Sequence, residues 1–181
     1  MLELLLSNIV FIQCFGAVGY ALFAASGLFK QRRHMFLAEC IGCAIVSIQW
    51  VLLAAPAAAW MNIALVYSAL SGMVSERFPK MQILVLLSIP LSAFLIWTFG
   101  EGGGMDLIIF AAALPGFCAK YLRSVFTLRV LSILGSVLWL FVNGALGSVP
   151  GVLCSSGYLI GHSWSLFKEL QLENRFSSQR A

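Results

Sequence analysis

Long apolar runs fill most of the chain, and short breaks that hold charged residues, glycine or proline separate them. The runs lack the alternation of apolar and polar residues that marks a membrane β-strand, so they predict helices. Several have the roughly 17–25 residues that a helix needs to cross the ~30 Å hydrocarbon core of a bilayer. We expect seven transmembrane helices, at about residues 7–29, 35–54, 60–74, 81–99, 107–119, 130–146 and 152–167. The third and the fifth of these are short.

Two of the breaks resemble each other at an offset of 93 residues. At this offset Ala54-Ala55-x-x-Ala58 aligns with Gly147-Ser148-x-x-Gly151. The match indicates a duplicated unit of three helices in parallel repeats, joined by a linker helix. The predicted organisation is a first repeat at residues 1–80, a linker at 81–100, a second repeat at 101–170 and a cytoplasmic tail at 171–181. The polar end of the chain, from residue 168 onward, is expected to be frayed.

Composition excludes a soluble domain. Hydrophobic residues make up 61% of the 181 and charged residues 10%, against about 45–50% and about 25% in soluble globular proteins. The sequence therefore predicts an all-α integral membrane protein whose first partner is the lipid bilayer.

The charges predict its orientation. With seven helices every lysine and arginine lies on one side, and the other side holds Glu3, Glu101 and Asp106. If the fifth run did not cross, six of the eleven basic residues would change sides. The positive-inside rule then predicts an N-terminus outside, in the periplasm, and a C-terminus in the cytoplasm. The basic residues lie where orientation and anionic lipid headgroups favour them. The net charge of +4 therefore needs no nucleic-acid partner to explain it, and none is expected.

Residue types that carry catalysis are sparse. The chain has two histidines, His34 and His162, so a histidine-rich metal site cannot form, and it has no GxSxG motif. The glycine-rich stretch at 100–104 follows no predicted strand, so it is interpreted as an outer loop and not a phosphate cradle. We expect no catalytic residue, no metal and no cofactor, and a protein that is not an enzyme.

The cysteines allow one alternative to that expectation. All five lie in apolar runs, where free thiols behave as small apolar side chains. Cys40 and Cys43 form a CxxC motif, which is typical of thiol–disulfide chemistry. The motif lies on the predicted cytoplasmic side, where disulfides are kept reduced, so a membrane thiol oxidoreductase is the third of our hypotheses. The neighbouring Glu39 is expected to pair with Arg33 or Arg129, or to extend toward the interface.

Polar side chains inside the predicted helices are candidates for a binding site, because they are costly to place in lipid. Asn62 and Asn143 lie near the outer ends of two helices, where they either bind a polar solute or cap and join helices beside a tight turn; we favour the second interpretation. Trp50 and Trp139 could stack on a sugar-like ring. Together with Trp60 they also suit an aromatic belt at the outer interface, which we favour.

The last predicted helix is the most polar, with Ser155, Ser156, Tyr158, His162 and Ser163. Tyr158 and His162 are four residues apart and share one face, and Ser155 lies close to it. This face either lines a wet pathway, with His162 as a protonatable group, or is buried with its hydroxyls bonded to the preceding turn. The sequence favours neither.

Three helices, a linker helix and three more helices in parallel repeats form the architecture of SWEET-type transporters. The segments Leu52-Leu53-Ala54-Ala55-x-x-Ala58-Ala59-x-x-Asn62 and Trp139-x-x-x-Asn143-x-x-x-Gly147-Ser148-x-x-Gly151 resemble the YgjV-like family of bacterial inner-membrane proteins, which is grouped with the SWEET and PQ-loop proteins. The similarity covers residues 15–169. The chain departs from the family pattern at Gln49, where a histidine is expected, and it has no proline–glutamine pair.

The resemblance implies a facilitator in the bacterial inner membrane that exposes a central site to each side in turn. Because the predicted helices hold few charges, we expect a small neutral or zwitterionic solute, carried by a monomer or a homodimer. The substrate-binding candidates are Asn62, Asn143, Ser155, Tyr158, His162, Trp50 and Trp139. The alternative is a non-transporting scaffold or partner subunit, in which the same residues only pack helices.

Overall fold

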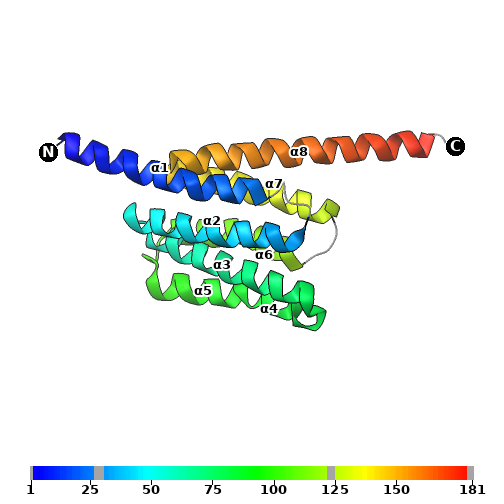
Figure 1. The fold of residues 1–181 in the computed structure, drawn as a ribbon, viewed down its shortest axis with the longest axis horizontal. Coiled ribbons are helices and arrows are strands. Elements are labelled where there is room, and N and C mark those ends of the chain that lie inside the picture. Colours follow the sequence, from blue (N-terminus) through cyan, green and yellow to red (C-terminus); the bar gives the residue numbers. More distant parts are fainter. Residues whose placement is uncertain (1, 27–30, 122–124, 179–181) are drawn as a thin grey trace.

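The computed structural model describes residues 2–26, 31–121 and 125–178, and this part of the chain is helical, without a strand. Its elements are α1 (Leu2–Ser26), α2 (Arg32–Leu52), α3 (Pro56–Arg77), η1 (Pro79–Gln82), α4 (Ile83–Leu86), α5 (Ser88–Phe99), α6 (Gly104–Tyr121), α7 (Val125–Ala145) and α8 (Val149–Ser178). The short elements η1, α4 and α5 follow one another as a single rod beside α3 (Figure 1). The predicted all-α class is confirmed.

Five segments of the described chain are long and apolar enough to cross a bilayer. They are Asn8–Ser26, Arg33–Leu52, Pro56–Arg77, the rod Pro79–Phe99 and Gly104–Tyr121. The apolar stretch in α7, Arg129–Ala145, is shorter, and the more polar α8 is not among the five. The protein is therefore a helical membrane protein with several spans, and the count of seven stays a prediction.

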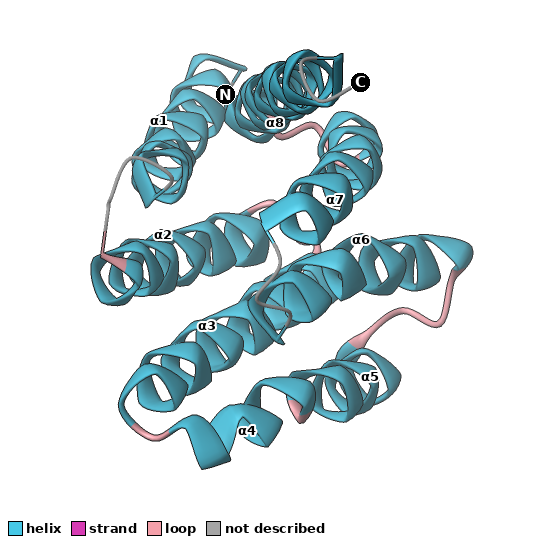
Figure 2. Ribbon diagram, turned by 90° about the vertical axis from the view of Figure 1, so that its right-hand side faces the viewer, coloured by secondary structure: helices cyan, strands magenta, loops and turns pink. Residues whose placement is uncertain are grey.

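Six helices form a closed ring in the order α1, α2, α3, α6, α7, α8 (Figure 2). Contacts between α1 and α8 close the ring on one side, and contacts between α3 and α6 close it on the opposite side. The rod packs outside the ring, against α3 and α6. Exchanging α1 with α6, α2 with α7 and α3 with α8 leaves the order of contacts around the ring unchanged.

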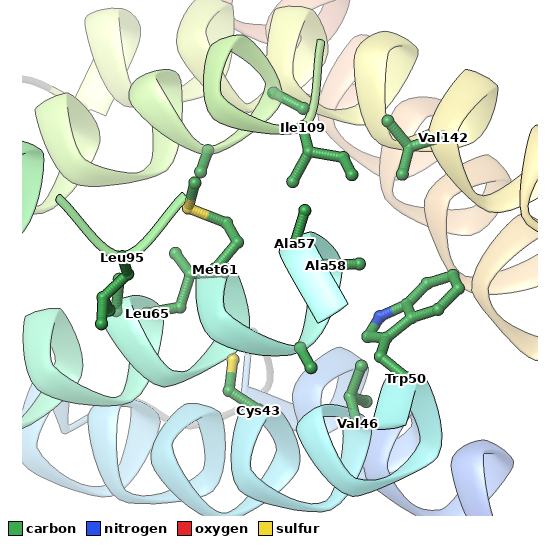
Figure 3. Packing of buried hydrophobic residues seen from close by; sticks show 14 of the residues in the cluster. Cys43, Val46, Trp50, Ala57, Ala58, Met61, Leu65, Leu95, Ile109 and Val142 are labelled. Carbon is green, nitrogen blue, oxygen red and sulfur yellow. The ribbon is translucent and has the colours of Figure 1, made fainter. Parts of the chain in front are cut away.

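The side of the ring formed by α3 and α6 is dry and closely packed. Alanines from both helices are buried there in one cluster with Met61 and Ile109 (Figure 3), namely Ala57, Ala58, Ala64, Ala112 and Ala113. Small residues allow two helix backbones to approach closely, which is the main attraction between helices in lipid.

Several of the predicted helices are longer than their apolar runs, and the expected frayed end is wrong as far as Ser178. The third, expected at 60–74, is Pro56–Arg77, because Pro56 suits the first turn of a helix. The fifth, expected at 107–119, is Gly104–Tyr121. At the start of this helix the Asp106 carboxylate accepts a hydrogen bond from the Gly102 amide at 2.8 Å. At the other end α8 continues to Ser178, because residues 168–178 include several good helix formers.

The two similar turns share one backbone conformation. Between α2 and α3 the amides of Leu53, Ala54, Ala55 and Ala59 donate to the carbonyls of Gln49, Val51, Trp50 and Ala55. Between α7 and α8 the amides of Leu146, Gly147, Ser148 and Val152 donate to the carbonyls of Val142, Gly144, Asn143 and Ser148. Each bond in one turn has its counterpart 93 residues away. Ala54 and Gly147 occupy equivalent positions with φ of 55° and 74°, so the alanine adopts a conformation that favours glycine.

Substitutions at these equivalent positions should have opposite effects. Gly147→Ala should destabilise the protein by about 1–2 kcal/mol, the usual cost of a left-handed backbone for a residue with a Cβ. Ala54→Gly removes that strain and should be neutral or stabilising by up to about 1 kcal/mol, since glycine also loses more entropy on folding. Reversible unfolding in mixed detergent micelles measures both. Equal destabilisation by the two substitutions would contradict the assignment.

Candidate functional site

A cluster of buried and half-buried polar side chains lies where α1 and α8 close the ring. Its members come from α1, from the end of α2, from α7, from the turn into α8 and from α8 itself. They are Gln13, Tyr20, Gln49, Asn143, Ser148 and Ser155, called the polar cluster below. Polar groups inside a membrane protein are costly unless paired, so such a cluster is the first candidate for a functional site.

Asn143 joins three helices. Its Oδ1 accepts a hydrogen bond from the Tyr20 hydroxyl of α1 at 2.8 Å, and its Nδ2 donates to Oγ of Ser155 in α8 at 3.0 Å. The Asn143 side chain is 1% exposed, so these bonds are shielded from competition with water. One amide therefore uses both its acceptor and its donor to hold α1, α7 and α8 together.

Gln49 occupies the centre of the cluster, fully buried at the end of α2. Its Nε2 lies 3.4 Å from Oε1 of Gln13 and 3.4 Å from Oγ of Ser148, both long for hydrogen bonds. Gln13 in turn donates to the Gly147 carbonyl at 2.9 Å. Oε1 of Gln49 has no hydrogen-bond partner within the described residues. The cluster therefore has an unused acceptor at its fully buried glutamine.

Two glycines provide the space that the side-chain amides of Gln49 and Asn143 occupy. A Cβ on Gly16 of α1 would overlap the Gln49 amide. A Cβ on Gly151 of α8 would overlap Oδ1 of Asn143 and lie 2.7 Å from the Tyr20 hydroxyl. The absence of side chains at these positions lets α1 and α8 approach the amides of α2 and α7 closely.

Tyr158 and His162 extend the polar face of α8 from the cluster toward the C-terminal end of α1. The Tyr158 hydroxyl donates to the Phe23 carbonyl at 2.8 Å and lies 3.4 Å from Oγ of Ser26. The rings of Tyr158 and His162 stack with centroids 5.4 Å apart, as expected for residues that share a helix face. Because both Tyr158 partners are on α1, this face also belongs to the contact between α1 and α8.

The other predicted site residues lie elsewhere. Asn62 is buried in α3, and its Nδ2 donates to the Ala58 carbonyl of its own helix at 2.9 Å, so it does not join the cluster. Trp139 is half-buried against the core, and Trp60 stacks on Phe99 at 4.5 Å. The favoured interpretation of Trp50 as an interface anchor is wrong, because its side chain is 0% exposed and packs among the core residues of Figure 3.

Sequence reasoning missed several members of the cluster. The pattern does not single out Gln13 or Tyr20, and Ser148 and Gln49 enter only through the repeated turn and as a departure from the family pattern. A signal was present in the two glutamines, because an amide inside an apolar run needs a partner. Which partner it meets depends on the ring order, which the sequence does not state.

The structure gives Glu39 a partner that the sequence did not suggest. Its Oε2 lies 3.2 Å from Nζ of Lys120 in α6. The side chains are 13% and 10% exposed, so the ion pair is largely buried. Nearby, Cys43 of the CxxC motif is buried and Cys40 is half-buried, and both are free thiols.

A ring of apolar helices that encloses hydrogen-bonded polar groups defines an integral membrane protein. A family comparison specifies the class: the chain belongs to Imp-YgjV, a family of bacterial inner membrane proteins whose model matches residues 10–172. The family expected from the two small-residue segments is confirmed, and with it the bacterial inner membrane. No curated protein and no solved structure matches the chain.

Gly151→Ala should disrupt the polar cluster. The added methyl group forces Asn143 away from Tyr20, which should destabilise the protein by about 1–3 kcal/mol through the lost hydrogen bond and the overlap. Gly157→Ala in the same helix is the matched control, since its Cβ would meet no described atom within 4 Å. It should be neutral or stabilising by up to about 1 kcal/mol. Unfolding in mixed micelles compares the two, and similar stabilities would contradict the role of Gly151.

Proposed function

We propose that the protein is a facilitator of a small polar solute, neutral or zwitterionic, built in the 3+1+3 manner of SWEET-type transporters. The observation that carries the proposal is the polar cluster, in which the fully buried Gln49 has an unpaired Oε1 and only long contacts from its Nε2. Buried polar groups are nearly always paired, so an under-satisfied amide inside a membrane protein suits a hydrogen-bonding ligand.

The symmetry of the contacts supports two repeated units. Two repeated units, α1–α3 and α6–α8, would contact each other along two edges, between α3 and α6 and between α8 and α1. The closed ring has contacts at both of these edges. The four matching backbone bonds in the two turns also support the repeat. In this proposal the rod of η1, α4 and α5 is the linker helix.

The two edges suggest how the units move. The α3–α6 edge is packed with alanine and braced by the rod, which contacts both helices, and the Gln82 amide donates to the Tyr121 carbonyl. Among the described residues the α1–α8 edge has no such brace and depends on the hydrogen bonds of Tyr20, Asn143 and Tyr158. The proposed motion is a rocking about α3–α6 that opens and closes α1–α8 and exposes the polar cluster to each side in turn.

The basic residues support the proposed orientation. Arg33, Arg77 and Lys120 lie at the ends of α2, α3 and α6 that share one end of the ring (Figure 1). Under the positive-inside rule this end faces the cytoplasm, and the polar cluster lies nearer the periplasm.

The second candidate function is a non-transporting scaffold or partner subunit. The alanine-packed α3–α6 edge favours it, because a dry seam of small residues is what helix packing alone requires. A scaffold makes no use of the unpaired Oε1 of Gln49, and this difference separates the two functions experimentally.

Comparing the two asparagines tests the proposal. Purified protein is screened for thermal stabilisation by alanine, glycerol and glucose, because a ligand of the native state raises the melting temperature by mass action. Asn143→Ala should abolish the response and the uptake of the same solute by proteoliposomes. Asn62→Ala is the matched control and should retain both, since its bond stays within α3.

Folding has to be separated from binding in this test. Tyr20→Phe removes only the hydroxyl that donates to Asn143. It should weaken solute binding at least several-fold and cost about 1–2 kcal/mol of stability, which leaves the protein folded. If no solute binds and uptake equals that of empty liposomes, the scaffold replaces the transporter as the better hypothesis.

A further inference from the structure

Glu39 and Lys120 form a buried ion pair between helices that are not neighbours in the ring. Glu39 belongs to α2 and Lys120 to the last turn of α6, with α3 between them in the ring order. Their side chains are 13% and 10% exposed, and the carboxylate and ammonium are 3.2 Å apart. The pair therefore joins the first three-helix unit to the second.

Both charges belong to candidate membrane spans, Glu39 as the seventh residue of Arg33–Leu52 and Lys120 in the last turn of Gly104–Tyr121. Glu39 follows Arg33, the first residue of its candidate span, by about 9 Å of helix. The pair therefore lies toward the end of the ring that Arg33 and Arg77 share.

We propose that Glu39 and Lys120 form a recognition site for a zwitterion, whose ammonium group binds Glu39 and whose carboxylate binds Lys120. This assignment rests on the transport function proposed above and narrows its solute from neutral or zwitterionic to zwitterionic. The solute enters as the pair separates, and each charge of the pair exchanges one opposite charge for another.

Net charge is the physical basis of the selectivity. Two opposite charges in a low-dielectric interior are tolerated only while both are paired. A zwitterion keeps every charge paired, whereas a lone anion leaves Glu39 without its partner and a lone cation leaves Lys120 without its own. An uncharged amide cannot offset the free energy of separating the two side chains, because it offers each charge only a dipole in place of an opposite charge.

The site should therefore change its preference with its own charge. The probes are four solutes of similar size, namely alanine, propionate, ethylammonium and propionamide, with binding to the full-length protein measured by calorimetry at constant ionic strength. The wild-type protein should bind alanine at least about tenfold more tightly than the other three. Glu39→Gln should shift the preference to propionate, and Lys120→Gln should shift it to ethylammonium.

Two kinds of control keep this test independent of folding. The exchange Glu39→Lys with Lys120→Glu restores a neutral pair and should restore the preference for alanine. Arg77→Gln and Glu101→Gln change the net charge by the same amounts at exposed positions and should leave the wild-type order intact. A preference that follows net charge in these controls, or a wild-type protein that binds the four probes equally or not at all, overturns the assignment.

The outcome is distinguishable from failure of the proposed function. Tight binding of alanine without uptake into proteoliposomes would leave the zwitterion site standing and remove the transporter. Uptake of glycerol or glucose that is unchanged in Glu39→Gln and Lys120→Gln would support transport and overturn the zwitterion site.

Discussion

The hydrogen bond from Tyr20 to Asn143 stabilises the ring at its α1–α8 edge, where neighbouring helices of the ring make the fewest contacts. In lipid, apolar side chains gain little by leaving the bilayer for a neighbouring helix, so helices associate through close packing and hydrogen bonds. Tyr20 and Asn143 belong to α1 and α7, which are separated by α8 in the ring, and they meet because Gly151 leaves room between them. The contact of α1 with α8, and so the closure of the ring, depends on this buried bond and on that of Tyr158 to Phe23.

The two edges of the ring occupy equivalent positions but have opposite chemistry. Alanines fill α3–α6, where backbones approach closely and the rod covers both helices from outside. At α1–α8 the contacts are made by side-chain amides and hydroxyls from several helices. Dispersion contacts between small residues resist separation over the whole length of a seam, whereas a few hydrogen bonds can exchange their partners for a solute or water. This difference makes one edge suited to a hinge and the other to a gate.

The interior polar groups bridge helices that do not pack directly against each other. Glu39 reaches Lys120 across α3, and Gln49 reaches Ser148 beyond the end of α7. Such bridges are favourable only while each partner stays in place, because a separated charge or amide in the interior has no water to replace it. A structure held in this way has few intermediate states, as a protein with two alternative arrangements requires.

The sequence by itself determined the helical class, the membrane location, the family and the similarity of the two turns, because each depends on composition or on local pattern. It also placed Tyr158 and His162 on one face, since a spacing of four residues decides that within a helix. The tertiary structure alone decided that Trp50 is core, that Asn143 joins three helices while Asn62 bonds to its own, and that Lys120 is the partner of Glu39. These outcomes depend on which helices become neighbours, and the small apolar residues that set this order repeat throughout the chain, so the residues near a polar group in sequence do not identify its partner in the fold.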